Sequence, residues 1–318
     1  MTTLTGASQR RSAELNVLGR KQRSLWGDAM HRVVRNRLAV IGLVVIALAL
    51  LAALLAPWIS PYGPNEQDPS LSLMEPRLVG NPQYVNAKYL LGSDALGRDI
   101  LTRLIWSARI SMVVGFVPVA LIFVIGVTLG LVSGYHGGRL DSVLMRFTDV
   151  VYAFPDLLFL LIVMATLRDS PIGEIFGGLF LMFIAIALVA WVGLARLTRG
   201  QILSLKEKEF VEAARTIGAG SGRIMLRHLL PNALGPIIVS LSFAIPSAIL
   251  IEATLSFIGI GVKPPTPSWG VMIHDGFVVF STTPWPVLLP AFCISIVMLS
   301  FTFVGDGLRD ALDPRMRI

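Results

Sequence analysis

Six long apolar runs constrain what this 318-residue chain can fold into. They cover residues 38–57, 111–133, 150–167, 175–195, 233–258 and 286–305. A helix needs about 20 apolar residues to cross a bilayer core of about 30 Å, and these runs lack the alternation of barrel strands. With 54% hydrophobic and 15% charged residues, the chain is neither disordered nor typical of a soluble domain. The sequence therefore predicts an all-α membrane protein with six transmembrane helices.

The basic residues predict the orientation of these helices. Of the 27 Lys and Arg residues, 20 fall on one side of the predicted bilayer. Cytoplasmic loops carry the excess of Lys and Arg, so both termini are expected in the cytoplasm. The cations are dispersed over loops and tails, which argues against a nucleic-acid partner for the net charge of +7. Trp58, Trp191, Trp269 and Trp285 fall near the ends of runs, where interfacial tryptophans are expected.

Three parts follow from this pattern. Residues 1–23 are polar and predict a mobile tail, after which Ser24 can cap a helix. Residues 24–37 have the spacing of an amphipathic helix lying at the membrane surface, unless the first span simply begins earlier. Residues 38–318 would form the six-helix domain. Its first run is too long for the apolar region of a cleavable signal peptide, so we expect it to be retained.

Motifs for enzyme chemistry are missing from the sequence. No G-x-x-x-x-G-K-[ST] loop for ATP occurs, the four histidines are scattered, and no H-E-x-x-H or Ser/His/Asp arrangement is present. The single cysteine, Cys293, excludes a disulfide framework and a cysteine-rich metal site. We therefore expect no enzyme activity, no bound cofactor and no metal in this chain.

The longest cytoplasmic loop, residues 196–232, has an ordered pattern. It begins with a predicted amphipathic helix over residues 208–217. Four apolar residues share one side of that helix: Phe210, Val211, Ala214 and Ile217. Gly218 stands where a helix stop needs a left-handed residue, and Ser221 can cap a second helix. An exposed apolar side favours a protein partner over solvent.

The same loop carries a recognisable string. It comprises Glu212, Ala213, Ala214, Gly218, His228 and Pro231. At this spacing it resembles the EAA loop of ABC importer permeases. The resemblance implies a coupling helix that sits in a groove of a separate ATPase subunit. Two adjacent alanines permit close approach, and Glu212 offers a fixed charge to the partner or to its own loop.

The outer segment, residues 58–110, carries a second motif. Its residues include Gly92, Asp94, Gly97, Arg98 and Asp99. The string resembles the L-G-T-D-x-x-G-R-D signature of the C-type permeases for dipeptides and oligopeptides, with Ser93 in place of threonine. Taken alone, Asp94 or Asp99 would cap a helix on the outer membrane surface.

Two further strings resemble the same family. One runs over residues 252–270, and the other, near the C-terminus, includes Gly305, Asp306 and Asp310. Residues 302–304 depart from the pattern, since they read Thr-Phe-Val where the family more often has Asn-Leu-Leu. From about residue 24 onward the chain is identified as a C-type permease, which implies the type I ABC importer permease fold.

The resemblance also implies partners. A second homologous permease subunit, two ATP-binding subunits and an extracytoplasmic solute-binding protein would complete an importer in the inner membrane of a prokaryote. ATP and Mg would bind to the partner ATPase subunits. The family's substrates are mostly di- and oligopeptides, although relatives carry nickel, glutathione or sugars. The permease would move solute by alternating access.

Two acids, Asp156 and Glu252, lie inside predicted spans. An unpaired charge there is costly, so each should face protein or water, and either could line the translocation path. The alternatives are a structural cap or a partner for Arg146 in the case of Asp156, and a hydrogen bond at a subunit interface for Glu252. Pro155 predicts a kink immediately before Asp156.

A self-sufficient secondary transporter or channel is the main alternative function. Such a protein would need its own gating charges and often has an internal repeat, and the sequence shows no repeat. A co-purifying ATPase would distinguish the two. A membrane-embedded enzyme would need a catalytic constellation that the sequence lacks.

Overall fold

The structure, a computed structural model, describes residues 25–78 and 81–312, so the predicted tail and the Ser24 cap lie outside the described residues. In this part of the chain the regular structure is helical, apart from two isolated β-bridges in the outer segment. The longer helices are α2 (Leu25–Arg35), α3 (Arg37–Ile59), α4 (Ile100–His136), α5 (Gly138–Tyr152), α6 (Asp156–Leu167), α8 (Leu179–Leu205), α11 (Leu230–Phe257) and α13 (Trp285–Leu312). The shorter elements are η1 (Pro69–Leu71), η2 (Pro82–Tyr84), α7 (Pro171–Glu174), η3 (Ile175–Gly178), α9 (Glu209–Thr216), α10 (Ser221–Arg223), η4 (Ile224–Leu229) and α12 (Trp269–Phe277).

Five stretches are long and apolar enough to cross a membrane, and they contain α3, α4, α8, α11 and α13. The third predicted span is a bent pair, because α5 and α6 meet at an angle of 74° and make a sixth span only when taken together. α6 has 12 residues. At about 1.5 Å per residue it is too short to cross the bilayer core alone. Pro155 stands directly before α6, so the predicted kink is confirmed.

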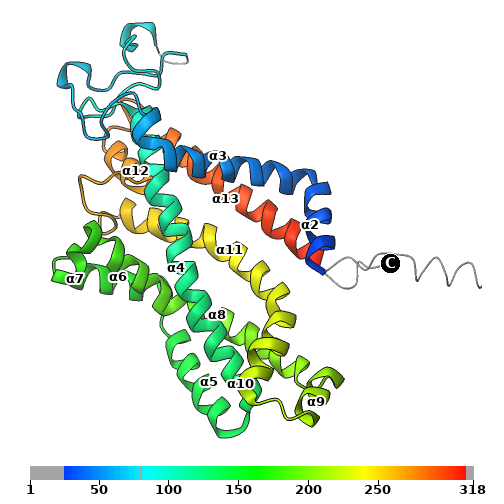
Figure 1. The fold of residues 1–318 in the computed structure, drawn as a ribbon. Helices are drawn as coiled ribbons and strands as arrows, with labels where there is room; N and C mark the ends of the chain where they lie inside the picture. Colours follow the sequence, from blue (N-terminus) through cyan, green and yellow to red (C-terminus); the bar gives the residue numbers. More distant parts are fainter. Residues whose placement is uncertain (1–24, 79–80, 313–318) are drawn as a thin grey trace, which may run out of the picture.

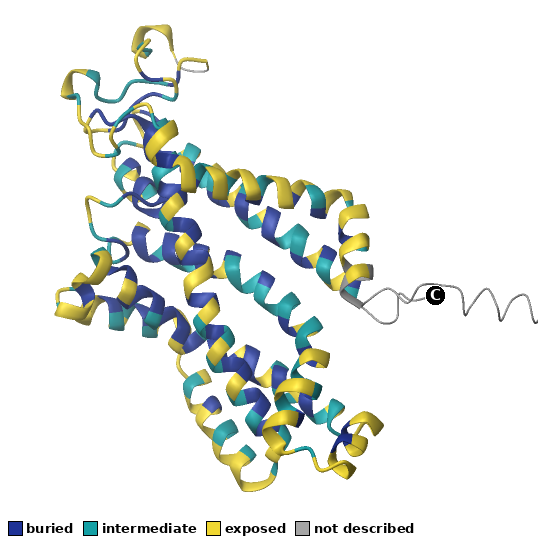
Figure 2. Ribbon diagram, viewed as in Figure 1, coloured by how far each residue is buried: buried dark blue, intermediate teal, exposed yellow. Residues whose placement is uncertain are grey.

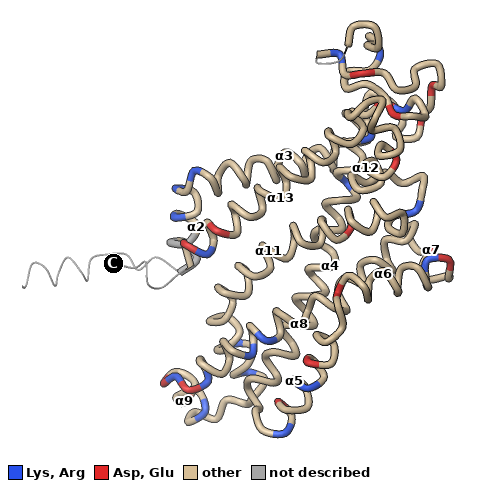
Figure 3. The backbone as a smooth tube through the Cα atoms, turned by 180° about the vertical axis from the view of Figure 1, so that it is seen from behind, with Lys and Arg blue, Asp and Glu red and all other residues tan. Residues whose placement is uncertain are grey.

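The helix ends gather at two opposite sides of the molecule. α2 packs on the end of α13, where Val33, Ala39 and Ala311 form a small buried cluster. Figure 1 shows α9 and α2 toward one side and the outer segment, α7 and α12 toward the other. Figure 3 shows Lys and Arg near α2 and around α9. We call these sides the inner end and the outer end, in line with the orientation predicted from charge.

α4 begins earlier than the second predicted span. The helix expected on the outer surface after Asp94 or Asp99 is the first part of α4, which runs without a break from Ile100 to His136. Asp99 caps it, since its side chain accepts hydrogen bonds from the backbone N–H and the hydroxyl of Thr102 at 2.8 and 2.6 Å. The apolar side of residues 100–108 packs on other helices, so the surface position is wrong and the predicted cap is right.

A glycine row holds α4 and α8 close together. Gly126, Gly130 and Gly134 are spaced four residues apart along one face of α4. A Cβ at Gly130 would lie 2.5 Å from the carbonyl oxygen of Ala195, and one at Gly134 would lie 3.0 Å from that of Arg199. Small residues at this spacing let helix backbones approach in a membrane, where packing drives association. These two helices therefore form a close-packed unit that runs between the two ends.

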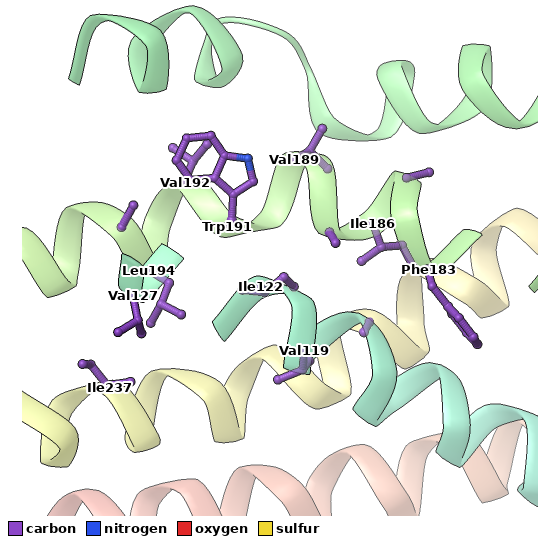
Figure 4. Packing of buried hydrophobic residues seen from close by; sticks show 14 of the residues in the cluster. Val119, Ile122, Val127, Phe183, Ile186, Val189, Trp191, Val192, Leu194 and Ile237 are labelled. Carbon is purple, nitrogen blue, oxygen red and sulfur yellow. The ribbon is translucent and has the colours of Figure 1, made fainter. Parts of the chain in front are cut away.

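The main core lies around this pair. Figure 4 shows Leu194 of α8 beside Val127 of α4, with the ring of Trp191 on the side of α8 away from α4 and Ile237 on the neighbouring α11. A second cluster packs α3, α12 and α13 against α4 and α11. Figure 2 shows that α3 keeps one side exposed along its length, as a lipid-facing span does.

Two of the tryptophans expected at the interface are buried instead. Trp191 is 3% exposed and stacks on Phe147 with ring centroids 6.0 Å apart. Trp269 is also 3% exposed, and its indole N–H donates to the carbonyl of Leu104 at 3.1 Å. The interfacial prediction is wrong for both, because each ring packs against neighbouring helices, and Trp191 lies in the middle of α8. Trp58 is exposed, as expected.

Candidate functional site

α8 extends well into the predicted coupling loop. It ends at Leu205, so Arg196 and Arg199 belong to a helix and not to the loop. Arg199 donates two hydrogen bonds of 2.6 Å to Asp141 of α5, and Arg196 pairs with Asp149 at 2.7 Å. Ser133 also donates to Asp141. These contacts fasten α4, α5 and α8 together at the inner end.

The amphipathic helix expected next is α9, but its apolar residues do not share one side. Val211 and Ala214 are buried against the protein. Phe210 is 38% exposed and Ile217 is 85% exposed. The predicted single face is therefore wrong: one pair of apolar residues anchors α9, and the other pair points to the exterior.

Glu212 and Ala213 share that exterior. Both are exposed, and α9 presents them next to Arg215. Within the described part of the chain, no salt bridge forms to the charged groups of Glu212, Arg215, Arg223 or Arg227. The inner loop thus exposes Ala213, the apolar side chain of Ile217 and several charges without a salt bridge on the same surface.

A glycine turn ends α9. Gly218 has φ of +81°, the left-handed conformation that the sequence predicted. The N–H of Ala219 closes the turn on the carbonyl of Ala214 at 3.0 Å. The next helix, α10, has Gly220 at its N-cap and no side-chain cap, so the cap predicted for Ser221 is wrong.

A π-helical turn joins the coupling loop to α11. η4 spans Ile224–Leu229, and Ile224 and Leu229 are 1% and 0% exposed. The carbonyl of His228 accepts a hydrogen bond from Asn232 at 2.6 Å, and Pro231 occupies the first turn of α11, where a missing N–H costs nothing. Sequence reasoning missed the π-turn, which often marks functional sites and has no signature of its own.

The outer signature folds into a tight loop. Gly92 and Gly97 have φ of +77° and +70°. A Cβ at Gly92 would lie 2.2 Å from the carbonyl oxygen of Met74, and one at Gly97 would lie 1.9 Å from that of Asp68. Both glycines are thus required by conformation and by contact. The outer segment closes over the start of α4 as a result.

Buried ion pairs fix this loop to α12. Asp94 accepts hydrogen bonds of 2.6 Å from both Arg98 and Arg103. Arg98 also donates to Asp275 of α12 at 2.8 Å, and Arg103 reaches the same oxygen at 3.3 Å. The side chains of Asp94, Arg98 and Arg103 are 7%, 10% and 2% exposed. Sequence reasoning missed Arg103 and Asp275, because no local spacing links two residues 172 positions apart.

Glu252 is enclosed by the chain. Its Oε1 accepts hydrogen bonds from Ser256 at 2.8 Å and from Ser268 at 2.6 Å, and Ser268 in turn caps α12. Glu252 is 0% exposed, and Oε2 has no hydrogen-bond partner among the described residues. The carboxylate therefore ties the end of α11 to the start of α12, and it touches no open path in this conformation of the chain.

Asp156 has the opposite environment. It is exposed in the first turn of α6, directly after the break that follows α5. Arg146 forms no salt bridge with it in the described residues. A carboxylate in the first turn favours the helix N-terminus, so the cap-like alternative fits its position.

The C-terminal signature combines close packing with exposed charge. A Cβ at Gly305 would lie 2.8 Å from the hydroxyl of Ser242 on α11, and one at Gly307 would lie 2.6 Å from the Cβ of Ala39 on α3. Asp306 and Asp310 are exposed. The glycines let α13 pack between α3 and α11, while the acids remain accessible at the inner end.

A surface ion pair also holds the outer segment. Lys88 lies 3.0 Å from Asp68, and Ser70 donates to the other oxygen of that carboxylate at 2.5 Å. The hydrogen bonds from Ser70 and Lys88 lower the pKa of Asp68 below its ordinary value of 3.8. The hydrogen bond to Asp68 raises the pKa of Lys88. In the part of the chain described, no group of three or more His, Cys, Asp or Glu residues could hold a metal ion.

Comparison with known sequences agrees with the family resemblance of the signature strings. Residues 126–318 match the family described as binding-protein-dependent transport system inner membrane component, and residues 24–76 match the N-terminal TM domain of oligopeptide transport permease C. The oligopeptide transport system permease protein OppC of Bacillus subtilis is 40% identical over 300 residues, which cover 94% of this chain and 93% of that protein. The dipeptide transport system permease protein DppC of the same organism is 39% identical, over 98% of this chain and 92% of that protein.

A solved structure shares the fold. An inward-facing conformation of the MetNI methionine ABC transporter aligns with a TM-score of 0.51 at 17% identity. The alignment covers 66% of this chain and 96% of that chain. At this identity the likeness extends to the arrangement of the helices alone.

Proposed function

The chain belongs to the binding-protein-dependent transport system inner membrane components, and on that premise we propose that its cargo is a di- or oligopeptide. It is a bacterial inner-membrane permease subunit of an ABC importer and is not itself an ATPase. Relatives at 39–41% identity that are named for oligopeptide or dipeptide transport support the peptide cargo. Nickel, glutathione and sugars are the other cargoes that the family resemblance leaves open.

The coupling loop is the observation that carries the mechanism. α9 exposes Glu212, Ala213 and Ile217 together at the inner end, while Val211 and Ala214 anchor it to the chain. We propose that this exterior side docks on a partner ATPase subunit, which holds the ATP and Mg. A second permease subunit would supply the second coupling helix for the second ATPase.

Motion of α9 would reach the spans through two routes. The π-turn η4 leads from α10 directly into α11, and α8 leads into the loop from the other side. α8 is packed on α4 through the glycine row, so a push on the loop would move those two helices as one body. Such a rigid movement, driven by ATP binding and reset by hydrolysis, would expose the path alternately outward and inward.

For the translocation path we assign one charged residue, Asp156. Asp156 is exposed at the break between α5 and α6, so we propose that it lines the translocation path. The same role for Glu252 would require the enclosure by Ser256 and Ser268 to open. Full transport rates for Asp156→Asn in the reconstituted complex over pH 5–8 would exclude the path-lining role of Asp156.

Reconstitution distinguishes the proposed function from a secondary transporter. The permease pair, its ATPase subunits and the binding protein are incorporated into liposomes, and uptake of a labelled dipeptide and a labelled oligopeptide is measured. We expect uptake that requires both ATP and the binding protein. Uptake by the permease chain alone, driven by an ion gradient, would support a self-sufficient transporter. ATP-dependent uptake of nickel, glutathione or sugar in place of peptide would contradict the peptide cargo and would still agree with an ATP-driven importer.

A further inference from the structure

A cavity of about 450 Å³ opens at the outer end, between the signature loop of the outer segment and α12. Figure 1 shows these two elements next to each other at the side opposite α9. The buried ion pairs form the polar part of its wall, and apolar residues form the rest. Two signature strings of the sequence analysis, the outer motif and residues 252–270, contribute to its wall.

Among the ion-paired groups in the wall of this cavity, a carboxylate is the most exposed. The two guanidinium groups are nearly enclosed, because the side chains of Arg98 and Arg103 are 10% and 2% exposed. Asp275 is the accessible member, with its side chain 33% exposed. The hydrogen bonds from Arg98 and Arg103 to this carboxylate all end on Oδ2, so Oδ1 has no hydrogen-bond partner within the described residues.

The entrance to the cavity is apolar. Leu96 is 47% exposed on the signature loop, and Val278 is 83% exposed just after α12. Pro264 and Pro265 belong to the same wall. Apolar surface around a fixed, partly buried charge is the usual composition of a protein–protein hot spot, in which the rim excludes water from the central contact.

We propose that this cavity receives a Lys or Arg side chain of the external binding protein when that protein docks on the permease. The inference rests on the proposed function, since it assumes an importer with such a partner. The aliphatic stem would lie against Val278 and Pro265, and the cationic tip would pair with Oδ1 of Asp275. Arg98 and Arg103 act as positioning residues that hold this carboxylate in place.

An anionic occupant fits the cavity less well. Both guanidinium groups already donate to Asp94 and Asp275, and the side chains of Arg98 and Arg103 are less exposed than that of Asp275. An incoming carboxylate would therefore meet Asp275 first. Like charges at such a contact weaken binding, whereas opposite charges steer the encounter and fix its register.

Val278 provides a test that does not disturb the ion pairs. The complete complex is placed in lipid nanodiscs, and ATP hydrolysis is measured against the concentration of the binding protein. We expect Val278→Lys to raise the half-maximal concentration about two- to fivefold and Val278→Glu to lower it by a similar factor. Both shifts should shrink at high salt, because the charges at the rim are exposed.

Asp275→Asn gives the larger expected effect. Removal of the charge at the centre of the contact should raise the half-maximal concentration about tenfold or more. Asp169→Asn is the matched control, since Asp169 is 92% exposed at the outer end and pairs with Lys263 at 3.3 Å outside the cavity. Its half-maximal concentration should stay within twofold of the wild type.

Any other result contradicts the proposal that the binding protein docks at this cavity, and each result does so for a different reason. A lowered half-maximal concentration in Val278→Lys together with a raised one in Val278→Glu would mean an anionic occupant. Loss of the second permease subunit from the purified complex would mean that the cavity lies at the subunit interface. Equal half-maximal concentrations in the wild type and the two Val278 variants would mean that the binding protein docks elsewhere. If the wild-type complex shows no stimulation at all, the proposed function fails and the docking cavity fails with it.

Discussion

The two signature segments at the ends of this permease place their charged residues in opposite ways. At the outer end, Asp94, Arg98 and Arg103 are buried and bonded to one another and to α12. At the inner end, Glu212 and Arg215 are exposed, and they form no salt bridge within the described residues. Both segments resemble family signatures, yet one signature maintains the fold of the chain and the other leaves its charges available to a partner.

This difference explains what each signature requires of its residues. A buried ion pair that loses one partner leaves an uncompensated charge, so the outer residues cannot change singly without cost. An exposed charge costs little to replace in the isolated chain, because water solvates it in any case. Substitutions of Asp94, Arg98 and Arg103 should therefore act on folding, and substitutions in the inner loop should act on assembly and ATP hydrolysis.

The largest effect is expected at Arg103. Arg103→Ala removes one of the two guanidinium groups that Asp94 and Asp275 share and leaves Arg98 to balance both carboxylates, so the free energy of unfolding should fall by about 3–5 kcal/mol. Unfolding of the detergent-solubilised chain, followed by circular dichroism, measures it. Arg109→Ala is the matched control: Arg109 is on the same helix, is exposed and lies over the ring of Trp106. Equal effects for the two variants would mean that the outer cluster is not a structural unit.

The contact that links the two ends should be the next most sensitive. In Gly130→Ala the new methyl group would meet the backbone of α8, so the helices must separate, at a cost of about 1–3 kcal/mol. Gly193→Ala on α8 meets nothing within 4 Å and should stabilise the helix slightly, by less than about 1 kcal/mol. Thermal unfolding of both variants measures the difference. A stabilised Gly130→Ala would contradict the close approach.

A smaller effect is expected in the glycine turn of the inner loop. Gly218→Ala must hold a left-handed conformation, which costs about 1 kcal/mol, whereas Gly220 has φ of −67° and accepts alanine without strain. We expect reduced hydrolysis stimulated by the binding protein in Gly218→Ala and normal stimulation in Gly220→Ala. Both variants should insert normally, and only Gly218→Ala should be less stable than the wild type, by about 1 kcal/mol. Equal stimulation would show that the turn does not orient α9.

The smallest effect concerns the surface pair of the outer segment. The lowered pKa of Asp68 means that its carboxylate adds stability above its ordinary pKa of 3.8, and this stability is lost as the pH falls through the lower value. Hydrogen exchange of the outer segment should therefore be slightly faster in Asp68→Asn than in the wild type at pH 6, and the difference should vanish as the pH falls below the lowered pKa of Asp68. A difference that grows on acidification would contradict the sign.

The sequence was sufficient for much of this picture. Apolar runs of about 20 residues identified the spans, Pro155 predicted the break before α6, and Gly218 predicted the turn after α9. Each of these is a local property, readable from one residue and its neighbours. The family resemblance carried by the signature strings is confirmed by the matches over residues 24–76 and 126–318.

Other features depend on contacts that no local pattern encodes. Trp191 and Trp269 lie near the ends of runs, but neighbouring helices cover them. The partner of Arg103 on α12 is distant in the sequence, and the glycine row of α4 gains its meaning from α8. We expected a single apolar side on α9, because helical spacing shows which residues are neighbours. It does not show which of them the rest of the chain covers.

Stimulated ATP hydrolysis of a Glu212→Lys complex tests the central claim, that the inner end couples this chain to an ATPase. The matched control is Glu174→Lys, which reverses an exposed carboxylate in α7 at the outer end. We predict that Glu212→Lys inserts normally and loses the hydrolysis stimulated by the binding protein, while Glu174→Lys keeps it. Full stimulation in Glu212→Lys would contradict the account.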